Sequence, residues 1–247
     1  MDIAEDSIVK LLPYEILFER ADLIITLGGD GTLLHIAAKA SEHSTPVLGI
    51  NIGHLGYMTE LEINELDKLS KLFDGSFTVE SRIMLDVSVI REENKLIKFC
   101  ALNDAVISYG TVSRIITFSL FCDKKKATDY RADGIILSTP TGSTAYSLSA
   151  GGPIIEPSVS AITATPICPH SLSSKSIVFS DTSVLDVEIS PQNVGDIYLT
   201  VDGENNYPLQ INDRINIRKS NKQFSLIKIN DFSFFEILNK KFSEGGH

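Results

Sequence analysis

The segment from Asp22 to Leu34, DLIITLGGDGTLL, constrains the fold of this chain more than any other part of the sequence. An apolar and β-branched run from Leu23 to Leu27 stops at GGDGT, residues 28–32, and a helical pattern follows. A short run of this kind, bounded by glycine, is typical of a strand buried on both faces. The glycines permit a tight turn and let the backbone approach another molecule closely. We therefore expect a strand, a glycine turn and a helix that begins at about Thr32.

This arrangement favours a phosphate site, because the free amide N–H groups and the positive end of a helix dipole point into the turn. The unusual residue is Asp30, since a carboxylate repels phosphate. It can hold a divalent cation that neutralises the phosphates, or it can take a proton from an attacking hydroxyl. A third interpretation is a plain turn in which Asp30 caps the helix. The segment differs from the Walker loop and from the dinucleotide motif GxGxxG.

Composition excludes several classes of protein. The chain has 247 residues, 43% of them hydrophobic, which is enough for one or two domains, and its net charge is −10. This charge argues against nucleic acid or an anionic membrane as a partner. Three separated cysteines indicate neither a disulfide framework nor a zinc site. The acidic N-terminus is unlike a signal peptide, and no 18-residue apolar run occurs, so we expect a soluble cytoplasmic protein.

The first third of the chain alternates between helical and strand patterns. Residues 6–20 form an amphipathic helix candidate, and residues 46–51 read as a second buried strand. Apolar residues recur at helical spacing from Leu61 to Phe73, and Gly75 closes that helix. Strands and helices that alternate at this rhythm predict a parallel sheet.

The pattern changes after about Arg82. From there to Ile229 the apolar residues alternate or form short runs between turn residues, as in an all-β unit. The expected strands include residues 85–89, 105–107, 115–118, 135–137, 185–189 and 197–201. Asp202-Gly203 reads as a hairpin turn after the last of these strands. Residues 231–242 read as a short C-terminal helix.

A second segment, from Asp129 to Pro153, is rich in hydroxyl groups. Residues 138–147, STPTGSTAYS, carry small donors and acceptors that suit ribose hydroxyls, and Tyr146 offers a flat face for a base. The alternative is a Ser/Thr loop that caps a helix at about Ser143. Asn103-Asp104 after a strand can bind a ribose or an adenine edge, or can form an ordinary Asx turn. His170 reads as a loop or core residue.

Together these motifs resemble one family. The combination of GGDGT at 28–32, Asn103-Asp104, Asp133-Gly134 with STPTGSTAYS at 138–147, and TPICPH at 165–170 resembles bacterial NAD kinases. The likeness covers nearly the whole chain from Asp22 onward. It implies phosphorylation of the adenosine ribose 2′-hydroxyl of NAD by ATP, giving NADP, with a divalent metal, Mg²⁺. It also implies a Rossmann-like α/β domain of residues 1–82 plus about 231–247, and a C-terminal β-sandwich domain of residues 83–230 that binds the dinucleotide.

The resemblance assigns roles to individual residues. Asp30 resembles the family's general base, and its phosphate loop corresponds to Gly28, Gly29, Asp30, Gly31 and Thr32. The residues that resemble NAD contacts are Asp30, Gly31, Tyr57, Asn103, Asp104, Arg114, Arg131, Asp133, Thr144, Ala145, Tyr146, Ser147, Leu148, Ser149 and Cys168. The metal ligands are left unassigned. Members of the family are usually homodimers or homotetramers whose sites borrow residues across subunits.

Three departures from the family pattern stand out. Only 29 residues precede Asp30, so we expect the family's opening strand to be shortened or missing. Asp104 stands where Glu is commoner, and Glu204 where Gln is frequent. Two alternative functions remain at this point. One is a lipid kinase that shares the GGDGT motif, and the other is a non-catalytic NAD(P)-binding sensor.

Overall fold

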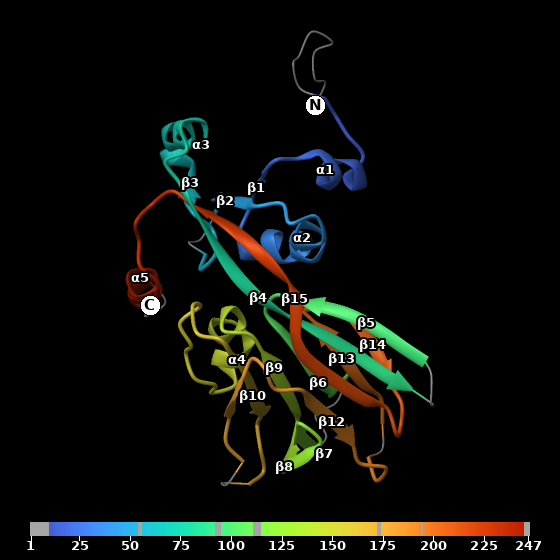
Figure 1. Cartoon of the computed structure of the whole chain (residues 1–247). Helices are drawn as coiled ribbons and strands as arrows, with labels where there is room; N and C mark the ends of the chain where they lie inside the picture. Colours follow the sequence, from blue (N-terminus) through green and yellow to red (C-terminus); the bar gives the residue numbers. More distant parts are fainter. Residues whose placement is uncertain are drawn as a thin grey trace.

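A computed structural model describes residues 10–53, 56–91, 95–110, 115–171, 174–193 and 195–244. An α/β part and a β part are stacked on one another, and two long strands run between them (Figure 1). The helices are α1 (Tyr14–Arg20), α2 (Asp30–His43), η1 (Ile63–Ser70), α3 (Lys71–Asp74), η2 (Thr141–Thr144), α4 (Tyr146–Ser149) and α5 (Phe234–Glu244), where η marks a 3₁₀ helix.

The strands of the described chain form two sheets. The larger has nine strands in the order β1-β2-β15-β12-β7-β8, with β3 beside β2 and with β4 between β15 and β5. Its strands are β1 (Ile24–Leu27), β2 (Val47–Asn51), β3 (Leu61–Glu62), β4 (Thr78–Arg91), β5 (Lys95–Ala101), β7 (Ile116–Cys122), β8 (Lys125–Ala132), β12 (Leu185–Ile189) and β15 (Arg214–Lys228). The six strands of the smaller, in spatial order, are β11 (Ile177–Ser180), β10 (Ala161–Ile167), β9 (Gly134–Ser138), β6 (Asp104–Tyr109), β13 (Ile197–Val201) and β14 (Glu204–Leu209).

The long strands β4 and β15 belong to both parts of the molecule. The first half of β15 pairs with β12 of the sandwich, whereas Leu226 near its end pairs in parallel with Val47 of β2. The predicted boundary between residues 82 and 83 falls inside β4, which pairs with β15 along most of its length. The division of the chain at 82 and 230 therefore remains a proposal, because one continuous sheet connects the two parts.

Each part has its own apolar core. In the β part, the inward side chains of both sheets form one cluster, which includes Val87, Phe118, Ile135 and Leu199. In the α/β part, α2 buries Leu33, Ile36, Ala37 and Ala40, a spacing that places them on one helix face. These residues pack with Phe224 and Leu226 of β15. This packing fixes the start of α2 at the junction of the two parts.

The predicted fold class, an α/β part with an all-β part, is confirmed. The strands β1, β2 and β3 pair in parallel, and Gly75 ends α3 in the left-handed conformation. One expectation was wrong, because β1 is not buried on both faces: Ile25 and Leu27 are 43% and 65% exposed. Their neighbours Leu48 and Ile50 on β2 are covered by η1 and α3, whereas β1 lies at the end of the sheet. No helix in the described ranges is long and apolar enough to cross a membrane.

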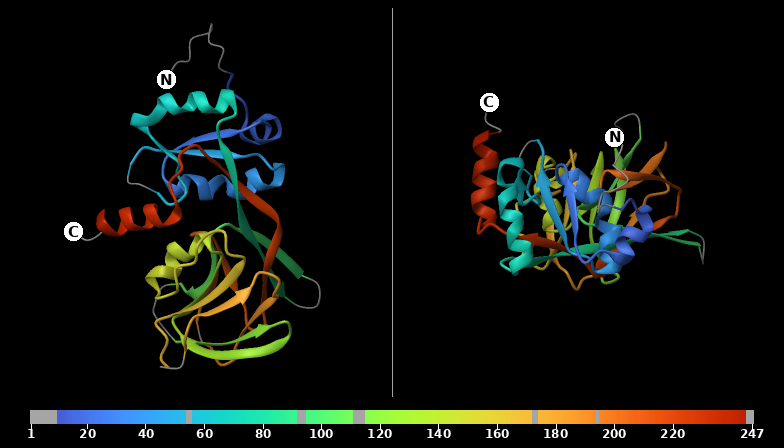
Figure 2. Two further views of the ribbon diagram at one scale, coloured as in Figure 1. Left: turned by 60° about the vertical axis from the view of Figure 1, so that its left-hand side comes forward. Right: turned by 90° about the horizontal axis from the view of Figure 1, so that it is seen from above.

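The C-terminal segment returns to the α/β part, as Figure 2 shows for α5. Lys240 of α5 forms an ion pair with Glu62 at 3.5 Å, and the Lys241 ammonium lies 4.4 Å from the ring centroid of Tyr57. The helix therefore contacts the loop that follows β2. That loop also touches the start of α2, as described next.

Candidate functional site

The glycine turn between β1 and α2 positions Asp30. The Gly28 N–H donates to the Ile50 carbonyl at 2.9 Å, which joins the turn to the end of β2. The Asp30 carboxylate accepts hydrogen bonds from the Tyr57 N–H at 2.7 Å and the Met58 N–H at 3.0 Å. Asp30 is therefore held by the next loop and does not cap its own helix. The residue before the helix is Gly29, and no side chain caps this end.

The backbone of the turn is open where a ligand can approach it. A Cβ on Gly28 would lie 2.1 Å from Thr32 Oγ1, so this position requires glycine. At Gly29 and Gly31, in contrast, a Cβ would meet nothing within 4 Å. The uncapped N–H groups of α2 and the positive end of its dipole thus face open space, which is the arrangement that binds phosphate. The five predicted phosphate-loop residues, 28–32, lie together here.

A cleft of about 390 Å³ lies beside this turn. It joins α2 to β6, to the turn between β13 and β14, and to the loop before α4. Four predicted residues line it, namely Asn103, Asp104, Ala145 and Tyr146, together with Leu34, Val106, Ser108, Thr200, Asp202 and Gly203. Leu34 follows Asp30 by one helical turn, so the two side chains leave the same face of α2. The cleft therefore begins one helical turn from Asp30, which is not itself part of the lining.

Asp202 organises the floor of the cleft. It occupies the predicted hairpin turn, and both Asp202 and Gly203 have positive φ, 50° and 74°. Its carboxylate accepts hydrogen bonds from three successive backbone N–H groups, those of Leu102 at 2.7 Å, Asn103 at 2.7 Å and Asp104 at 3.0 Å. This role was not predicted from the sequence, because the donors lie about a hundred residues away and no local pattern connects them.

Burial shapes the electrostatics of this floor. Burial, together with the nearby charge of Asp202, raises the pKa of Asp104 to about 7. Burial also raises the pKa of Asp202, although the three N–H donors act in the opposite direction. Asn103 is buried, and its Oδ1 has no hydrogen-bond partner among the described residues. Since unpaired buried acceptors are costly, Asn103 Oδ1 is suited to accept a hydrogen bond from a ligand.

Most hydroxyl groups of residues 138–147 support the loop itself and do not face a ligand. Thr139 donates to the Leu102 carbonyl at 2.6 Å, and Ser143 to the Pro140 carbonyl at 2.6 Å. Ser147 is fully buried and shares a 3.0 Å hydrogen bond with Thr165. The alternative prediction, a helix cap at about Ser143, is not found either, because no side chain caps η2 or α4.

The neighbouring predicted contacts differ in exposure. Tyr146 is 47% exposed and lines the cleft. Thr144 donates to the Thr141 carbonyl at 3.2 Å, Leu148 is half-buried and Ser149 is exposed. The roles of these residues in substrate binding stay predictions.

A second group of predicted residues lies at the other end of β9. Asp133 precedes this strand, and its N–H donates to the Ile167 carbonyl at 2.9 Å, next to Cys168. Arg131 and Cys168 are exposed, and none of the three lines the cleft. A strand of five residues spans roughly 16 Å, so this group is about that far from the end of β9 at which residues 138–147 begin. Arg114 lies outside the described residues.

The cleft nevertheless leads toward this second group. Asp104, Val106 and Ser108 alternate along β6 and all line the cleft. Asp104 is paired with Ser138 at one end of β9, and Ser108 with Gly134 at the other. An elongated ligand in the cleft thus has a path from the glycine turn toward Asp133.

Comparison with known proteins identifies the family. The ATP-NAD kinase N-terminal domain matches residues 14–77, and the ATP-NAD kinase C-terminal domain matches residues 102–229. The chain is 44% identical over 229 residues to the NAD kinase of Thermoanaerobacter sp. strain X514, covering 92% of this chain and 81% of that protein. The chain belongs to the NAD kinase family. The predicted function, NAD kinase, and the predicted enzyme class, phosphotransferase, are thereby confirmed.

A further relative and two solved structures support the same family assignment. The NAD kinase of Carboxydothermus hydrogenoformans is 41% identical over 241 residues, which is 97% of this chain and 86% of that protein. Yeast NADH kinase complexed with NADH superimposes with a TM-score of 0.86 at 30% identity, covering 95% of this chain and 70% of the yeast chain. The NAD kinase from Archaeoglobus fulgidus in complex with ATP gives 0.71 at 28% identity, covering 94% and 86%. The lipid kinase alternative is set aside, because both domain matches are to NAD kinases.

The acidic and other potential metal-binding side chains bear on the predicted divalent cation. Within them, no three His, Cys, Asp or Glu side chains gather closely enough to enclose a metal ion. Mg²⁺ typically keeps several waters and binds one or two carboxylates plus substrate phosphates. The site thus fits a cation that is bound mainly through the phosphate chain of a nucleotide.

Proposed function

We propose that this member of the NAD kinase family transfers the γ-phosphoryl group of ATP to the 2′-hydroxyl of the adenosine ribose of NAD, with Asp30 as the general base. The observation that carries the proposal is the position of Asp30. Its carboxylate is oriented by two backbone N–H groups, at the open N-terminus of α2, and one turn before Leu34 in the cleft. The NADH and ATP named for the two structural neighbours support a dinucleotide and ATP as ligands.

The proposed reaction uses groups that the chain supplies. A ribose hydroxyl is a weak nucleophile, so it must be aligned with the γ-phosphorus and must lose its proton as the new bond forms. The 2′-oxygen attacks phosphorus, ADP leaves, and the proton passes to the Asp30 carboxylate. The N–H groups at the start of α2 stabilise negative charge on the phosphate oxygens. Asn103 and Asp104 hold the adenosine half of NAD in the cleft.

The divalent cation is proposed to arrive with ATP as part of the substrate. It would neutralise charge on the phosphate chain, and Asp30 is the acidic residue within the glycine turn. We also propose a cytoplasmic homodimer or homotetramer. Its support is the second residue group, because Arg131 and Cys168 are exposed and outside the cleft of their own chain, as expected if they complete the site of a neighbouring subunit.

The direct test is formation of NADP by the purified chain from NAD, ATP and Mg²⁺. We expect saturable turnover that depends on both substrates. The alternative of a non-catalytic sensor predicts saturable NAD binding with no NADP formed, and that result would overturn the proposal. Replacing ATP with polyphosphate in the same assay defines the range of donors.

A further inference from the structure

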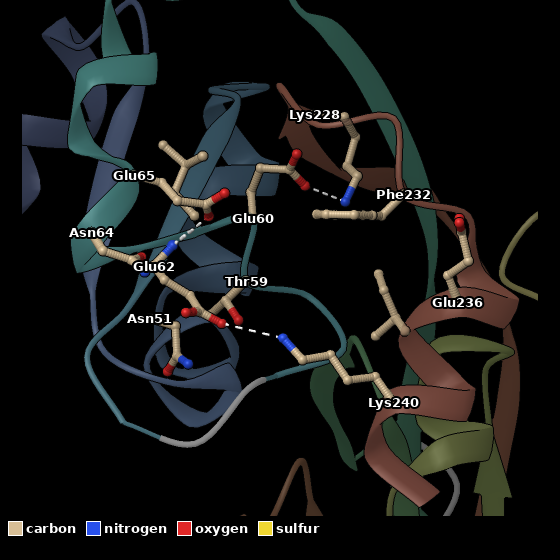
Figure 3. Close-up of a pocket in the computed structure, with 12 residues that line it drawn as sticks. Asn51, Thr59, Glu60, Glu62, Asn64, Glu65, Lys228, Phe232, Glu236 and Lys240 are labelled. Carbon is tan, nitrogen blue, oxygen red and sulfur yellow. Dashed lines mark hydrogen bonds and ion pairs between the residues drawn. The ribbon is translucent and has the colours of Figure 1, made fainter. Parts of the chain in front are cut away.

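A second cavity begins at Thr59, just after the loop that holds Asp30. It has a volume of about 280 Å³ and lies between α5 and the segment formed by β3 and η1 (Figure 3). This volume is close to the lower end for ligand pockets, so it suits part of a nucleotide. The residues that line it are Asn51, Thr59, Glu60, Leu61, Glu62, Asn64, Glu65, Lys228, Phe232, Glu236, Ile237 and Lys240.

The cavity adjoins the glycine turn. Asn51 is the last residue of β2, and ligands of α/β sheets bind beyond the carboxyl ends of parallel strands. Thr59 connects the cavity directly to Asp30. A Cβ on Gly56 would lie 2.1 Å from Asp30 Oδ1 and 2.7 Å from Thr59 Oγ1, so these two groups are close neighbours. A ligand in the cavity therefore begins within a few side chains of the proposed base.

The charges of the lining favour a neutral group that donates hydrogen bonds. Glu60 pairs with Lys228 and accepts the Ile229 N–H at 2.8 Å, and Glu62 pairs with Lys240 at 3.5 Å. Four glutamates against two lysines in the lining disfavour a phosphate inside the cavity. The exocyclic amine of a purine and the hydroxyls of a ribose suit these carboxylates.

An aromatic side chain completes this environment. Phe232 points into the cavity from the segment that joins β15 to α5 (Figure 3). Its side chain is 57% exposed, so its ring is available to stack on a base. Leu61 and Ile237 are the aliphatic residues of the lining.

The ammonium group of Lys241 lies near both this cavity and the loop that holds Asp30. Lys241 follows Ile237 by one helical turn, so both side chains leave the same face of α5. Its ammonium lies 4.4 Å from the ring centroid of Tyr57, whose N–H binds Asp30. Within the described ranges, Lys241 makes no ion pair with a carboxylate, so its charge is available to a phosphate.

We propose that this cavity binds the purine and ribose of the ATP donor, and that Lys241 contacts the phosphate chain that runs from the cavity to Asp30. The inference rests on the proposed function, since it assigns the donor to this cavity and NAD to the separate cleft. It makes α5 part of the donor site.

Two matched variants test the base position. Because stacking on an aromatic ring contributes substantially to base binding, Phe232→Ala should raise the KM for ATP at least about fivefold and leave the KM for NAD unchanged. Phe235→Ala is the control, since Phe235 is similarly exposed at 60%, lies in α5 and does not line the cavity. An unchanged KM for ATP in Phe232→Ala, with normal folding by circular dichroism, would overturn the proposal.

The phosphate path needs a separate probe. Inorganic tripolyphosphate competes with ATP but has no base, so Phe232→Ala should leave its inhibition constant unchanged. Lys241→Gln should raise that constant several-fold. Equal effects of both variants on tripolyphosphate would contradict the division into a base site and a phosphate path.

Photolabelling with 8-azido-ATP provides a test that does not depend on turnover. We expect labelled peptides from residues 59–65 or 228–240, protected by ATP and not by NAD. Label confined to residues 103–109 or 144–149 would refute the donor cavity. If the wild-type chain forms no NADP, the proposed function fails; if it forms NADP and the label lies elsewhere, only the donor cavity fails.

Discussion

The carboxylate of Asp30 accepts a 2.7 Å hydrogen bond from the backbone N–H of Tyr57, twenty-seven residues further along the chain. The ring of the same Tyr57 lies against Lys241 of the C-terminal helix. Burial and the charge of Asp30 both raise the pKa of the Tyr57 hydroxyl. The orientation of the proposed base thus depends on the glycine turn, the loop after β2 and α5 together.

Asp30→Asn should abolish most turnover and preserve NAD binding, because the amide retains the shape of the side chain but accepts no proton. General bases typically contribute about 10²- to 10⁴-fold in rate, and we expect a loss of that size in kcat. Steady-state kinetics and calorimetric NAD binding measure the two effects. Asp22→Asn, an exposed acid before β1, is the control. Near-normal turnover in Asp30→Asn would refute the base role.

Gly56→Ala should displace Asp30, since the new Cβ would lie 2.1 Å from its Oδ1. A shift of about 1 Å in a catalytic group can cost roughly 100-fold in rate, and overpacking costs about 1–3 kcal/mol of stability. Gly53→Ala is the matched control in the same loop, because a Cβ there meets nothing within 4 Å. Equal kinetics for the two variants would show that the close contact at Gly56 does not position Asp30.

Asp202→Asn should raise the KM for NAD at least tenfold. The amide cannot accept from all of the three N–H groups that the carboxylate binds, and each buried unsatisfied donor costs about 1–3 kcal/mol. The floor of the cleft should therefore lose its shape. Asp196 is an exposed acid just before β13, the strand that Asp202 follows, and Asp196→Asn should behave as the wild type. Thermal unfolding and NAD titration distinguish a loss of stability from a loss of binding.

The raised pKa of Asp104 predicts that the stability of the protein depends on pH. Burial and Asp202 raise its pKa from 3.8 to about 7 in the folded chain. Between these values the folded state keeps a proton that the unfolded state has released, so this group makes the free energy of unfolding fall as pH rises. Asp104→Asn cannot ionise and lacks this contribution. Urea unfolding should therefore show the variant gaining stability relative to the wild type from pH 5 to pH 8; a constant difference would contradict the raised pKa.

Replacing Glu204 with the Gln that is frequent in the family tests whether this difference affects stability. It accepts a hydrogen bond from His35 of α2 at 3.2 Å, and both side chains are more than half exposed. Exposed ion pairs contribute about 0–1 kcal/mol, so Glu204→Gln should change stability by less than about 1 kcal/mol. A much larger loss in thermal unfolding would mean that this contact joins the two parts of the molecule.

The elements of the fold follow largely from local patterns. The apolar run before Gly28 and the spacing of Leu33, Ile36, Ala37 and Ala40 specify β1 and α2, because strand and helix periodicities are local properties. The Asp202-Gly203 turn was predictable for the same reason. The burial of β1 was not, since the exposure of Leu27 depends on which strands η1 and α3 cover.

The sequence by itself determined the family, the position of the glycine turn and the candidate base, because these reside in short segments with characteristic residues. Only the tertiary structure decided what those residues contact. Asp202 reaches the backbone of residues 102–104, and α5 reaches Tyr57, across separations of about a hundred residues or more. The first contact arises from the pairing of β6 with β13, and the second from the return of the chain along β15 to the α/β part. No local periodicity encodes them, since hydrogen bonding and charge depend on distance in space and not along the chain.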